Sequence, residues 1–203
     1  MRNTTRWYRL LTHVGALVPL AMLLWNYWHN QLTANPIQYI TFRTGKTALV
    51  LLVLTLACTP VNALFRLPQV LALRRPLGLY AFAYAGMHFL TFIGLDYGFD
   101  VRSLQEAILE KRYALAGFAA FILLVPLAIT STKRWMKRLG RNWKRLHHLI
   151  YLAGILAVVH FVWLVKSDVR EPLAYGAVLV SLLVLRLARV REAFRKGVTA
   201  QRD

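Results

Sequence analysis

The sequence predicts an all-α protein, a polytopic membrane bundle of six transmembrane helices with both termini in the cytoplasm. The 203-residue chain is 58% hydrophobic with a mean hydropathy of +0.45, whereas soluble domains are about half apolar. Its apolar residues form blocks of about the 20 residues that a helix needs to cross a bilayer. The basic residues lie between these blocks, so the net charge of +18 indicates contact with membrane lipid and not with nucleic acid.

Six apolar stretches are expected to span the membrane, and residues 1–203 are expected to form a single transmembrane domain. None of the stretches shows the alternation of a barrel strand, and a helix satisfies its own backbone hydrogen bonds in lipid. The first stretch follows several arginines, as a signal peptide would, but no small-residue cleavage site comes after it. We therefore expect this helix to be retained. The expected spans are residues 10–28, 47–65, 77–95, 113–130, 146–165 and 173–190.

The distribution of Lys and Arg predicts the orientation. The N-terminus, the second and fourth loops and the C-terminal part together hold 19 of the 26 Lys and Arg residues and only two acidic residues. The remaining loops hold 7 basic and 6 acidic residues. Because positively charged flanks stay in the cytoplasm, both termini are expected there, in a multi-pass protein of the bacterial inner (cytoplasmic) membrane.

Two histidines are expected at a similar depth in the bilayer. The third and fifth spans run in the same direction, and His88 lies about three helical turns after Leu77, while His160 lies about four turns after Leu146. At about 1.5 Å per residue the two histidines lie within about 5 Å of each other in depth, in the outer half. One such imidazole could equally be a helix–helix hydrogen bond, but an ionisable residue inside the membrane is by default a functional candidate.

Haem is the cofactor that fits this pair best. Zinc is a poor fit, because no second carboxylate or thiol is expected at that depth. A haem needs only two neutral imidazoles facing each other, and two histidine ligands leave no open position for oxygen. The expected chemistry is therefore electron transfer. The single cysteine, Cys58, excludes an internal disulfide framework and a cysteine-ligated cluster.

A second, less complete set of histidines is expected at the cytoplasmic level. His147 and His148 lie about 18–20 Å below His160, and the equivalent position of the third span holds Arg75. On a straight helix His147 and His160 would lie about 140° apart around the axis. Either histidine of the doublet is a candidate to ligate a second haem or to line a quinone or flavin pocket. One of the two is expected to be an interface residue without a ligand. For His13, a structural role and a role in a quinone or cofactor site are equally expected.

Several motifs resemble those of the MsrQ family (formerly YedZ), which belongs to the ferric-reductase-like transmembrane group. They occur in the family's order and cover nearly the whole chain: "TGKTALVLLVLTLACTPV", "RRPLGLYAFAYAGMHFLTF", "AITSTKRWMKRLGRNWKRLHHLIYL" and "VVHFVW". The resemblance implies haem-iron ligands at His88, His160 and His147. His148 stands where the family often has another polar residue. Oxidase relatives carry two histidines on each ligand helix, and this chain does not.

The resemblance also implies a function. Members of this family pass electrons through haem b from the quinone pool, or from a cytoplasmic flavin reductase, to MsrP, a periplasmic molybdopterin enzyme that repairs methionine sulfoxide. They are thus electron-transfer subunits and not catalytic subunits, and FMN is also associated with them. The haem count expected here is one, or two if the lower site is filled.

Two other functions compete with this hypothesis. One is a self-contained cytochrome b quinol or metal reductase of the inner membrane, in which the haem reduces a small acceptor directly. The other is a non-redox transporter or scaffold in which the histidines serve packing. A haem absorption band in the purified protein would exclude the non-redox function, and dependence of reoxidation on a periplasmic partner separates the other two.

Overall fold

The computed structural model describes the backbone of residues 2–165 and 167–199 and the side chains of residues 6–165 and 167–187. Within these residues the chain is helical and has no strands, which confirms the all-α class. The elements are α1 (Arg2–Trp28), α2 (Pro36–Phe65), α3 (Pro68–Leu71), α4 (Arg74–Thr91), the π-helix η1 (Phe92–Asp96), α5 (Val101–Glu110), α6 (Arg112–Ile129), α7 (Lys133–Leu139), α8 (Arg141–His147), α9 (Leu149–Leu164) and α10 (Arg170–Thr199).

Five segments of the described chain are long and apolar enough to cross a bilayer. Each overlaps one of the first five expected spans almost completely, so the multi-pass membrane class is confirmed. The sixth expected span, residues 173–190, begins within α10, but residues 188–190 lie outside the described side chains. The sixth span therefore stays a prediction. The five segments are Arg6–Trp28, Pro36–Phe65, Pro68–Asp96, Arg112–Ile129 and Arg141–Leu164.

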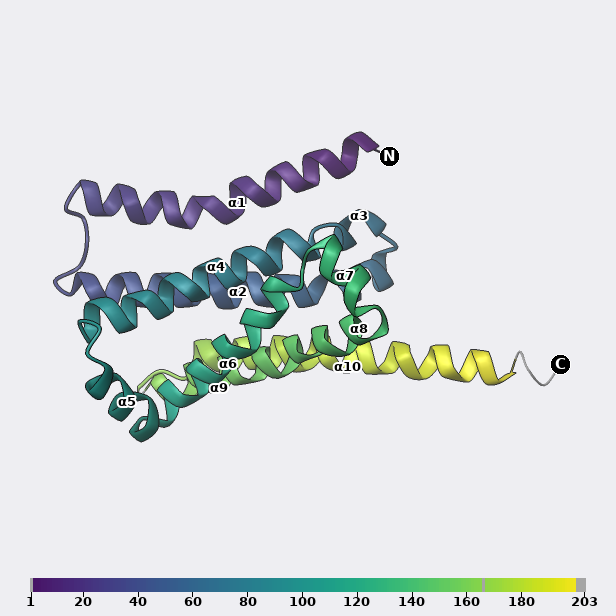
Figure 1. Ribbon diagram of the computed structural model, residues 1–203. Coiled ribbons are helices and arrows are strands. Elements are labelled where there is room, and N and C mark those ends of the chain that lie inside the picture. Colours follow the sequence, from purple (N-terminus) through teal and green to yellow (C-terminus); the bar gives the residue numbers. More distant parts are fainter. Residues whose placement is uncertain (1, 166, 200–203) are drawn as a thin grey trace.

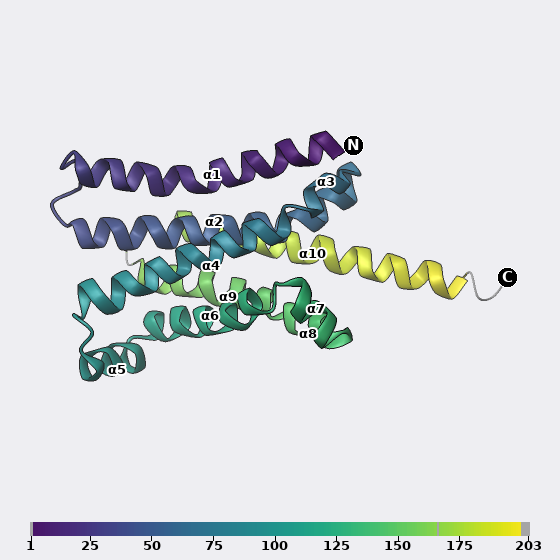
Figure 2. The ribbon, with the colours of Figure 1, turned by 45° about the horizontal axis from the view of Figure 1, so that its top comes forward.

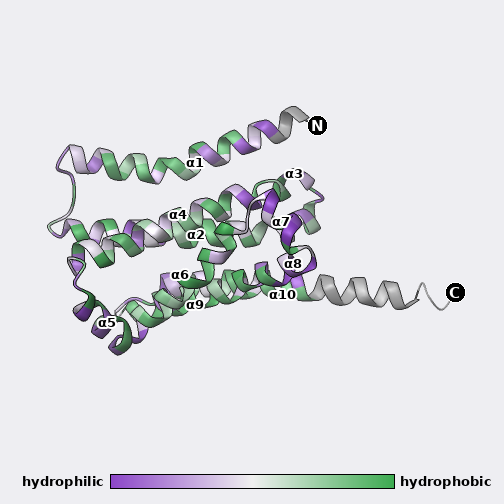
Figure 3. Ribbon diagram, viewed as in Figure 1, coloured by the Kyte–Doolittle hydropathy of each residue, from purple (hydrophilic) through white to green (hydrophobic). Residues whose placement is uncertain are grey.

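The long helices lie side by side, and the short helices gather at the two ends of the bundle (Figures 1 and 2). α3, α7 and α8 lie at the same end as the N-terminus, and α5 lies at the opposite end. Figure 3 shows that α5, α7 and α8 are more hydrophilic than the long helices between them. The second and fourth loops thus lie at the same end as the N-terminus, as the predicted orientation requires. The cytoplasmic location of both termini stays a prediction.

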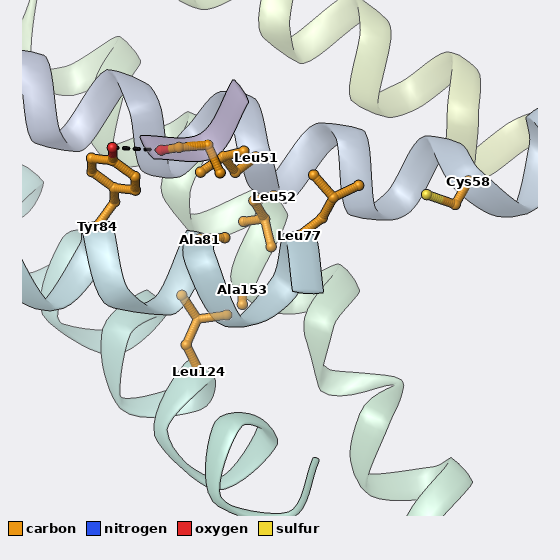
Figure 4. Close-up of a cluster of buried hydrophobic side chains, with 9 residues drawn as sticks. Leu51, Leu52, Cys58, Leu77, Ala81, Tyr84, Leu124 and Ala153 are labelled. Atoms are coloured by element: carbon orange, nitrogen blue, oxygen red, sulfur yellow. Dashed lines mark hydrogen bonds between the residues drawn. The ribbon is translucent and has the colours of Figure 1, made fainter. Parts of the chain in front are cut away.

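Two helix pairs form the centre of the bundle: α2 packs against α4, and α6 packs against α9. Small residues lie where the pairs meet. Ala81 of α4 is 1% exposed and Ala153 of α9 is fully buried, and such residues let membrane helices approach closely. Leucines from three of the helices surround these alanines (Figure 4): Leu51, Leu52, Leu77 and Leu124.

The side chain of Tyr84 joins α1 to this core. Its hydroxyl donates to the carbonyl of Ala16, 2.7 Å away (Figure 4). It also accepts from the backbone N–H of Leu20 at 3.1 Å. In a regular helix that N–H would bond to that carbonyl, so the hydroxyl occupies the place of a helical hydrogen bond. Pro19, which lacks an N–H, lies beside this position. A side chain inserted next to a proline is a recognised cause of helix bending.

Removing the Tyr84 hydroxyl is expected to loosen α1. Tyr84→Phe should cost about 1–3 kcal/mol, the usual cost of leaving buried backbone groups without a partner. We expect a lower melting temperature in detergent and faster amide exchange around residues 16–20. Tyr80→Phe is the matched control, because the Tyr80 hydroxyl contacts the exposed His13. Equal effects of the two substitutions would contradict this role of Tyr84.

The fifth expected span, residues 146–165, overlaps the segment Arg141–Leu164, but a turn interrupts the helix near its start. α8 ends at His147, His148 forms a turn, and α9 begins at Leu149. The indole N–H of Trp143 in α8 donates to the carbonyl of Thr130 at the end of α6, at 2.9 Å. This bond ties α8 to the neighbouring helix end. The angular separation calculated for a straight helix therefore does not apply to His147 and His160.

The connection between η1 and α6 contains a helix, α5, that the sequence analysis does not predict. Asp100 caps its N-terminus by accepting from the backbone N–H of Ser103 at 3.0 Å. Hydrogen bonds from Ser103 hold the pKa of the Asp100 carboxyl below its usual value. Beyond the other end of α5, Lys111 donates to the hydroxyl of Tyr97 at 2.9 Å. This bond joins the residues on either side of α5 and holds the connection together at the end of the bundle.

Candidate functional site

A cavity of about 860 Å³ lies among α2, α4, α6 and α9 and contains both His88 and His160 in its wall. Much of the wall is apolar, with aromatic rings such as Phe89 and Phe121, which stack with centroids 4.8 Å apart. The volume lies within the range of about 300–1,000 Å³ that is usual for cofactor sites. The polar part of the wall comes largely from residues near the α5 end of the bundle, among them Asn35, Gln38, Asp96, Tyr97 and Ser167.

His88 of α4 and His160 of α9 face each other in this cavity. Their ring centroids are 5.9 Å apart and the ring planes are 77° from parallel. With metal–nitrogen bonds of about 2 Å, two imidazoles on opposite sides of one metal have ring centres about 6 Å apart. The separation therefore fits a single metal held between the two histidines.

The hydrogen bonds of both rings define which nitrogen is free. The Nδ1 atom of His88 lies 2.8 Å from the carbonyl of Thr41, and that of His160 lies 2.7 Å from the carbonyl of Tyr113. A carbonyl only accepts, so each Nδ1 carries the proton and donates it. Each Nε2 then carries a lone pair, and among the described residues neither has a hydrogen-bond partner. Such a bond from the second ring nitrogen orients most metal-binding histidines.

Two glycines make room for these rings. A Cβ atom at Gly45 in α2 would lie 2.9 Å from Nδ1 of His88, and one at Gly117 in α6 would lie 2.6 Å from Nδ1 of His160. Side-chain atoms essentially never approach so closely. Each histidine therefore lies directly against the backbone of the neighbouring helix, one turn beyond the carbonyl that it contacts.

Comparison with known proteins places the chain in a family. The model of the ferric reductase like transmembrane component matches residues 44–158, which include His88 and end two residues before His160. The protein-methionine-sulfoxide reductase heme-binding subunit MsrQ of Xanthomonas axonopodis pv. citri (strain 306) is 47% identical over 201 residues, 96% of this chain and 91% of the relative. This chain belongs to the MsrQ family.

Other members of the MsrQ family show the same degree of similarity. The protein of the same name from Xanthomonas oryzae pv. oryzae (strain MAFF 311018) is 48% identical over 181 residues, 86% of this chain and 83% of its own. That from Caulobacter vibrioides (strain ATCC 19089) is 41% identical over 188 residues, 92% of this chain and 90% of its own. No solved structure matches the chain. The family resemblance inferred from the motifs is confirmed.

The site of this MsrQ family member is built from two similar halves that the sequence analysis missed. The helix pair α2 and α4 supplies Thr41, Gly45 and His88, and the pair α6 and α9 supplies Tyr113, Gly117 and His160. In both halves the histidine lies 47 residues after its carbonyl partner. The two halves align without a gap when His88 is placed on His160. The aligned identical residues of α4 and α9 are Leu77 and Leu149, Ala81 and Ala153, Ala85 and Ala157, His88 and His160, and Phe89 and Phe161. Those of α2 and α6 are Gly45 and Gly117, Ala48 and Ala120, Leu51 and Leu123, Leu52 and Leu124, and Val53 and Val125.

The other candidate histidines lie outside this cavity. His147 stacks on Trp143 with centroids 4.0 Å apart, and its Nε2 lies 3.1 Å from the hydroxyl of Thr130. That hydroxyl donates to the carbonyl of Pro126, so His147 is the donor to Thr130. His148 is exposed, and the Nδ1 atom of the exposed His13 lies 3.0 Å from the hydroxyl of Tyr80. Their assignment as cofactor ligands stays a prediction.

The described residues contain no group of three or more His, Cys, Asp or Glu side chains that could hold a metal ion. Two paired imidazoles suit a metal that brings its own further ligands, as the iron of a haem does.

Replacing His147 is expected to preserve the site formed by His88 and His160. In His147→Ala, haem per protein should stay at the wild-type level if the chain binds one haem, or fall by about half if His147 ligates a second. Haem content is measured from the absorption spectrum of the purified protein. A complete loss of haem in His147→Ala, with the protein still folded, would place His147 in the main site.

Proposed function

We propose that this chain holds a haem b between His88 and His160 and acts as the electron-transferring membrane subunit of a methionine sulfoxide reductase system. The observation that carries the proposal is the pair of imidazoles, each with its Nδ1 proton bound to a carbonyl and its Nε2 free, across one cavity. The names of the relatives support it, since they are described as heme-binding subunits of protein-methionine-sulfoxide reductase.

The residues of the chain have distinct parts in this function. His88 and His160 would hold the haem iron through their Nε2 atoms, and the carbonyls of Thr41 and Tyr113 would orient the two rings and raise the basicity of these nitrogens. The mostly apolar wall limits the access of water, which influences the redox potential. When bound there, the haem would supply one-electron transfer.

The direction of electron flow follows from the proposed placement in the bacterial inner membrane, with six spans and both termini cytoplasmic. The polar part of the cavity wall, near α5, would then face the periplasm, where the proposed acceptor MsrP resides. The quinone pool or a cytoplasmic flavin reductase would supply electrons, and FMN is a further proposed cofactor at the inner side. The dense positive charge of the fourth loop suits the anionic lipid of the cytoplasmic leaflet.

The decisive experiment measures reoxidation of the reduced haem. Membranes containing this chain are reduced through quinol, and the haem absorption is followed after adding a periplasmic molybdopterin reductase with methionine sulfoxide. We expect reoxidation to be at least about tenfold faster with the reductase than without it. A tenfold ratio corresponds to a difference of about 1.4 kcal/mol in the activation free energy. Equal rates would favour a self-contained cytochrome, and purified folded protein without a haem band would exclude both redox functions.

A further inference from the structure

A second cavity, of about 650 Å³, lies between α1 and α2. α1 is at the edge of the bundle (Figures 1 and 2), and two leucines in the cavity wall, Leu11 of α1 and Leu54 of α2, are 63% and 46% exposed. The cavity is therefore a groove that opens sideways toward lipid, and we refer to it as the α1–α2 groove. Among the described residues it shares Lys46 alone with the wall of the cavity of His88 and His160.

Both helices line the groove with one face. The wall residues recur every three or four positions, the spacing that places side chains on the same side of a helix. On α1 they include Leu11, Gly15 and Met22. On α2 the wall runs through Thr47, Val50, Leu54, Ala57 and Val61, and no residue from 47 to 65 is charged.

The polar side chains in the middle of the groove are bonded within their own helices. The hydroxyls of Thr12 and Thr47 and the thiol of Cys58 each donate to a backbone carbonyl four residues earlier, at 2.8, 2.8 and 3.2 Å. Each of these groups has a single hydrogen to donate, so none remains for a polar ligand. The middle of the groove therefore suits a hydrocarbon chain better than a polar ring such as that of a quinone.

Two basic residues mark the end of the groove near the start of α2. Arg43 and Lys46 lie three positions apart in its wall and directly precede the uncharged stretch 47–65. That stretch is about 27 Å long, close to the thickness of the hydrocarbon core of about 30 Å. Both charges therefore lie at the level of the lipid headgroups, toward which long basic side chains extend.

The net charge at this end of the groove is positive. Lys46 forms an ion pair with Glu171 at the start of α10. Arg43 is half-buried, and it takes part in neither of the ion pairs among the described side chains, Lys46 with Glu171 and Arg102 with Glu106. Two cations and one carboxylate leave one positive charge, which complements a headgroup with a single negative charge.

We propose that the α1–α2 groove binds one anionic phospholipid of the leaflet at the α5 end, with its phosphate at Arg43 and one acyl chain along the groove. A guanidinium binds phosphate oxygens through paired hydrogen bonds. The wall continues for about 27 Å along α2 from Arg43 to Val61, whereas a chain of one leaflet covers about half of the core, about 15 Å. The groove is therefore long enough for the chain. This site does not depend on the function proposed for His88 and His160.

Native mass spectrometry tests the headgroup contact. The full-length protein is released from nanodiscs that contain equal amounts of phosphatidylglycerol and phosphatidylcholine, and the lipids that it retains are counted. Arg43→Gln should lower the ratio of retained phosphatidylglycerol to phosphatidylcholine about fivefold, the factor that one basic residue contributes at a membrane surface. The matched control is Arg112→Gln, which removes an exposed charge at the start of α6, outside the groove. It should retain lipid like the wild type.

Substitutions that fill the groove test the position of the chain. A Cβ atom at Gly15 would have no neighbour within 4 Å, so Gly15→Leu places a side chain in the groove without a clash. Ala57→Leu fills the groove from the opposite wall. Both variants should retain one lipid fewer than the wild type. Gly86→Leu is the matched control, because Gly86 is equally open but lies outside the groove wall, and it should retain the wild-type number.

The same measurements distinguish a quinone from a lipid. A monodisperse elution profile in detergent reports that each variant is folded, and ubiquinone is then added to the lipid-loaded protein. Displacement of the lipid by a quinone that Arg43→Gln retains equally well, and that Gly15→Leu does not retain, would overturn the phospholipid as the occupant. Equal lipid retention by Arg43→Gln, Gly15→Leu and their two controls would overturn the proposed site itself.

Discussion

His88→Ala and His160→Ala are each expected to remove nearly all of the bound haem. Loss of a hydrogen bond that merely supports a metal ligand costs about 10–100-fold in affinity, and the loss of the ligand itself should cost more. Haem per protein, measured from the absorption spectrum, should therefore fall by more than about tenfold. The two variants should behave alike, because the two rings have equivalent surroundings.

A third histidine provides the control. His29 lies beyond the end of α1, stacks on Trp25 with centroids 4.0 Å apart and is not part of the cavity wall. His29→Ala should leave the spectrum unchanged. A folded His88→Ala or His160→Ala variant with the wild-type haem content would remove the basis of the proposed function.

Gly117→Ala is expected to have the next largest effect, although it leaves both histidines in place. The new methyl group would lie 2.6 Å from Nδ1 and 2.9 Å from Cε1 of His160, so the ring must move and its hydrogen bond to the carbonyl of Tyr113 must lengthen or break. We expect haem affinity to fall about 10–100-fold, as for the loss of a supporting hydrogen bond. Haem titration of the purified apoprotein measures the change.

Gly86 of α4 offers a matched control, because a Cβ atom there would have no neighbour within 4 Å. Gly86→Ala should bind haem like the wild type. Gly45→Ala should weaken binding less than Gly117→Ala, since its closest approach, to Nδ1 of His88, is 2.9 Å. If Gly117→Ala and Gly86→Ala bound haem equally well, His160 would not be held against the backbone of α6.

The sequence predicts the spans and the pairing of His88 with His160, because both depend on simple regularities. A bilayer demands long apolar stretches, and the helical rise converts residue number into depth. The break at His148 does not follow from either regularity. It coincides with contacts between α8 and the end of α6, such as that of Trp143 with Thr130, which no local pattern reveals.

The residues that support the two ligands could have been found only by aligning the chain with itself. Thr41 and Tyr113 contact the histidines through their backbone carbonyls. The identity of their side chains therefore does not reveal this role in the sequence. Gly45 and Gly117 are ordinary membrane-helix glycines when each is considered alone. The informative pattern is that Gly45 and Gly117 are separated by the same interval as His88 and His160. The difference at the other level is apparent from spacing alone, because Arg75 lies as far before His88 as His147 lies before His160.

This duplication has a consequence for any metal bound at the centre. Sites that activate small gases depend on asymmetry, with one strong ligand on the proximal side and an open or weak position on the distal side. Here each half contributes an imidazole held by the same kind of backbone bond, so the two residues that would hold the metal are nearly equivalent. Neither of them would yield more readily to an incoming diatomic molecule, and such a scaffold would suit a carrier of charge better than a catalyst of oxygen chemistry.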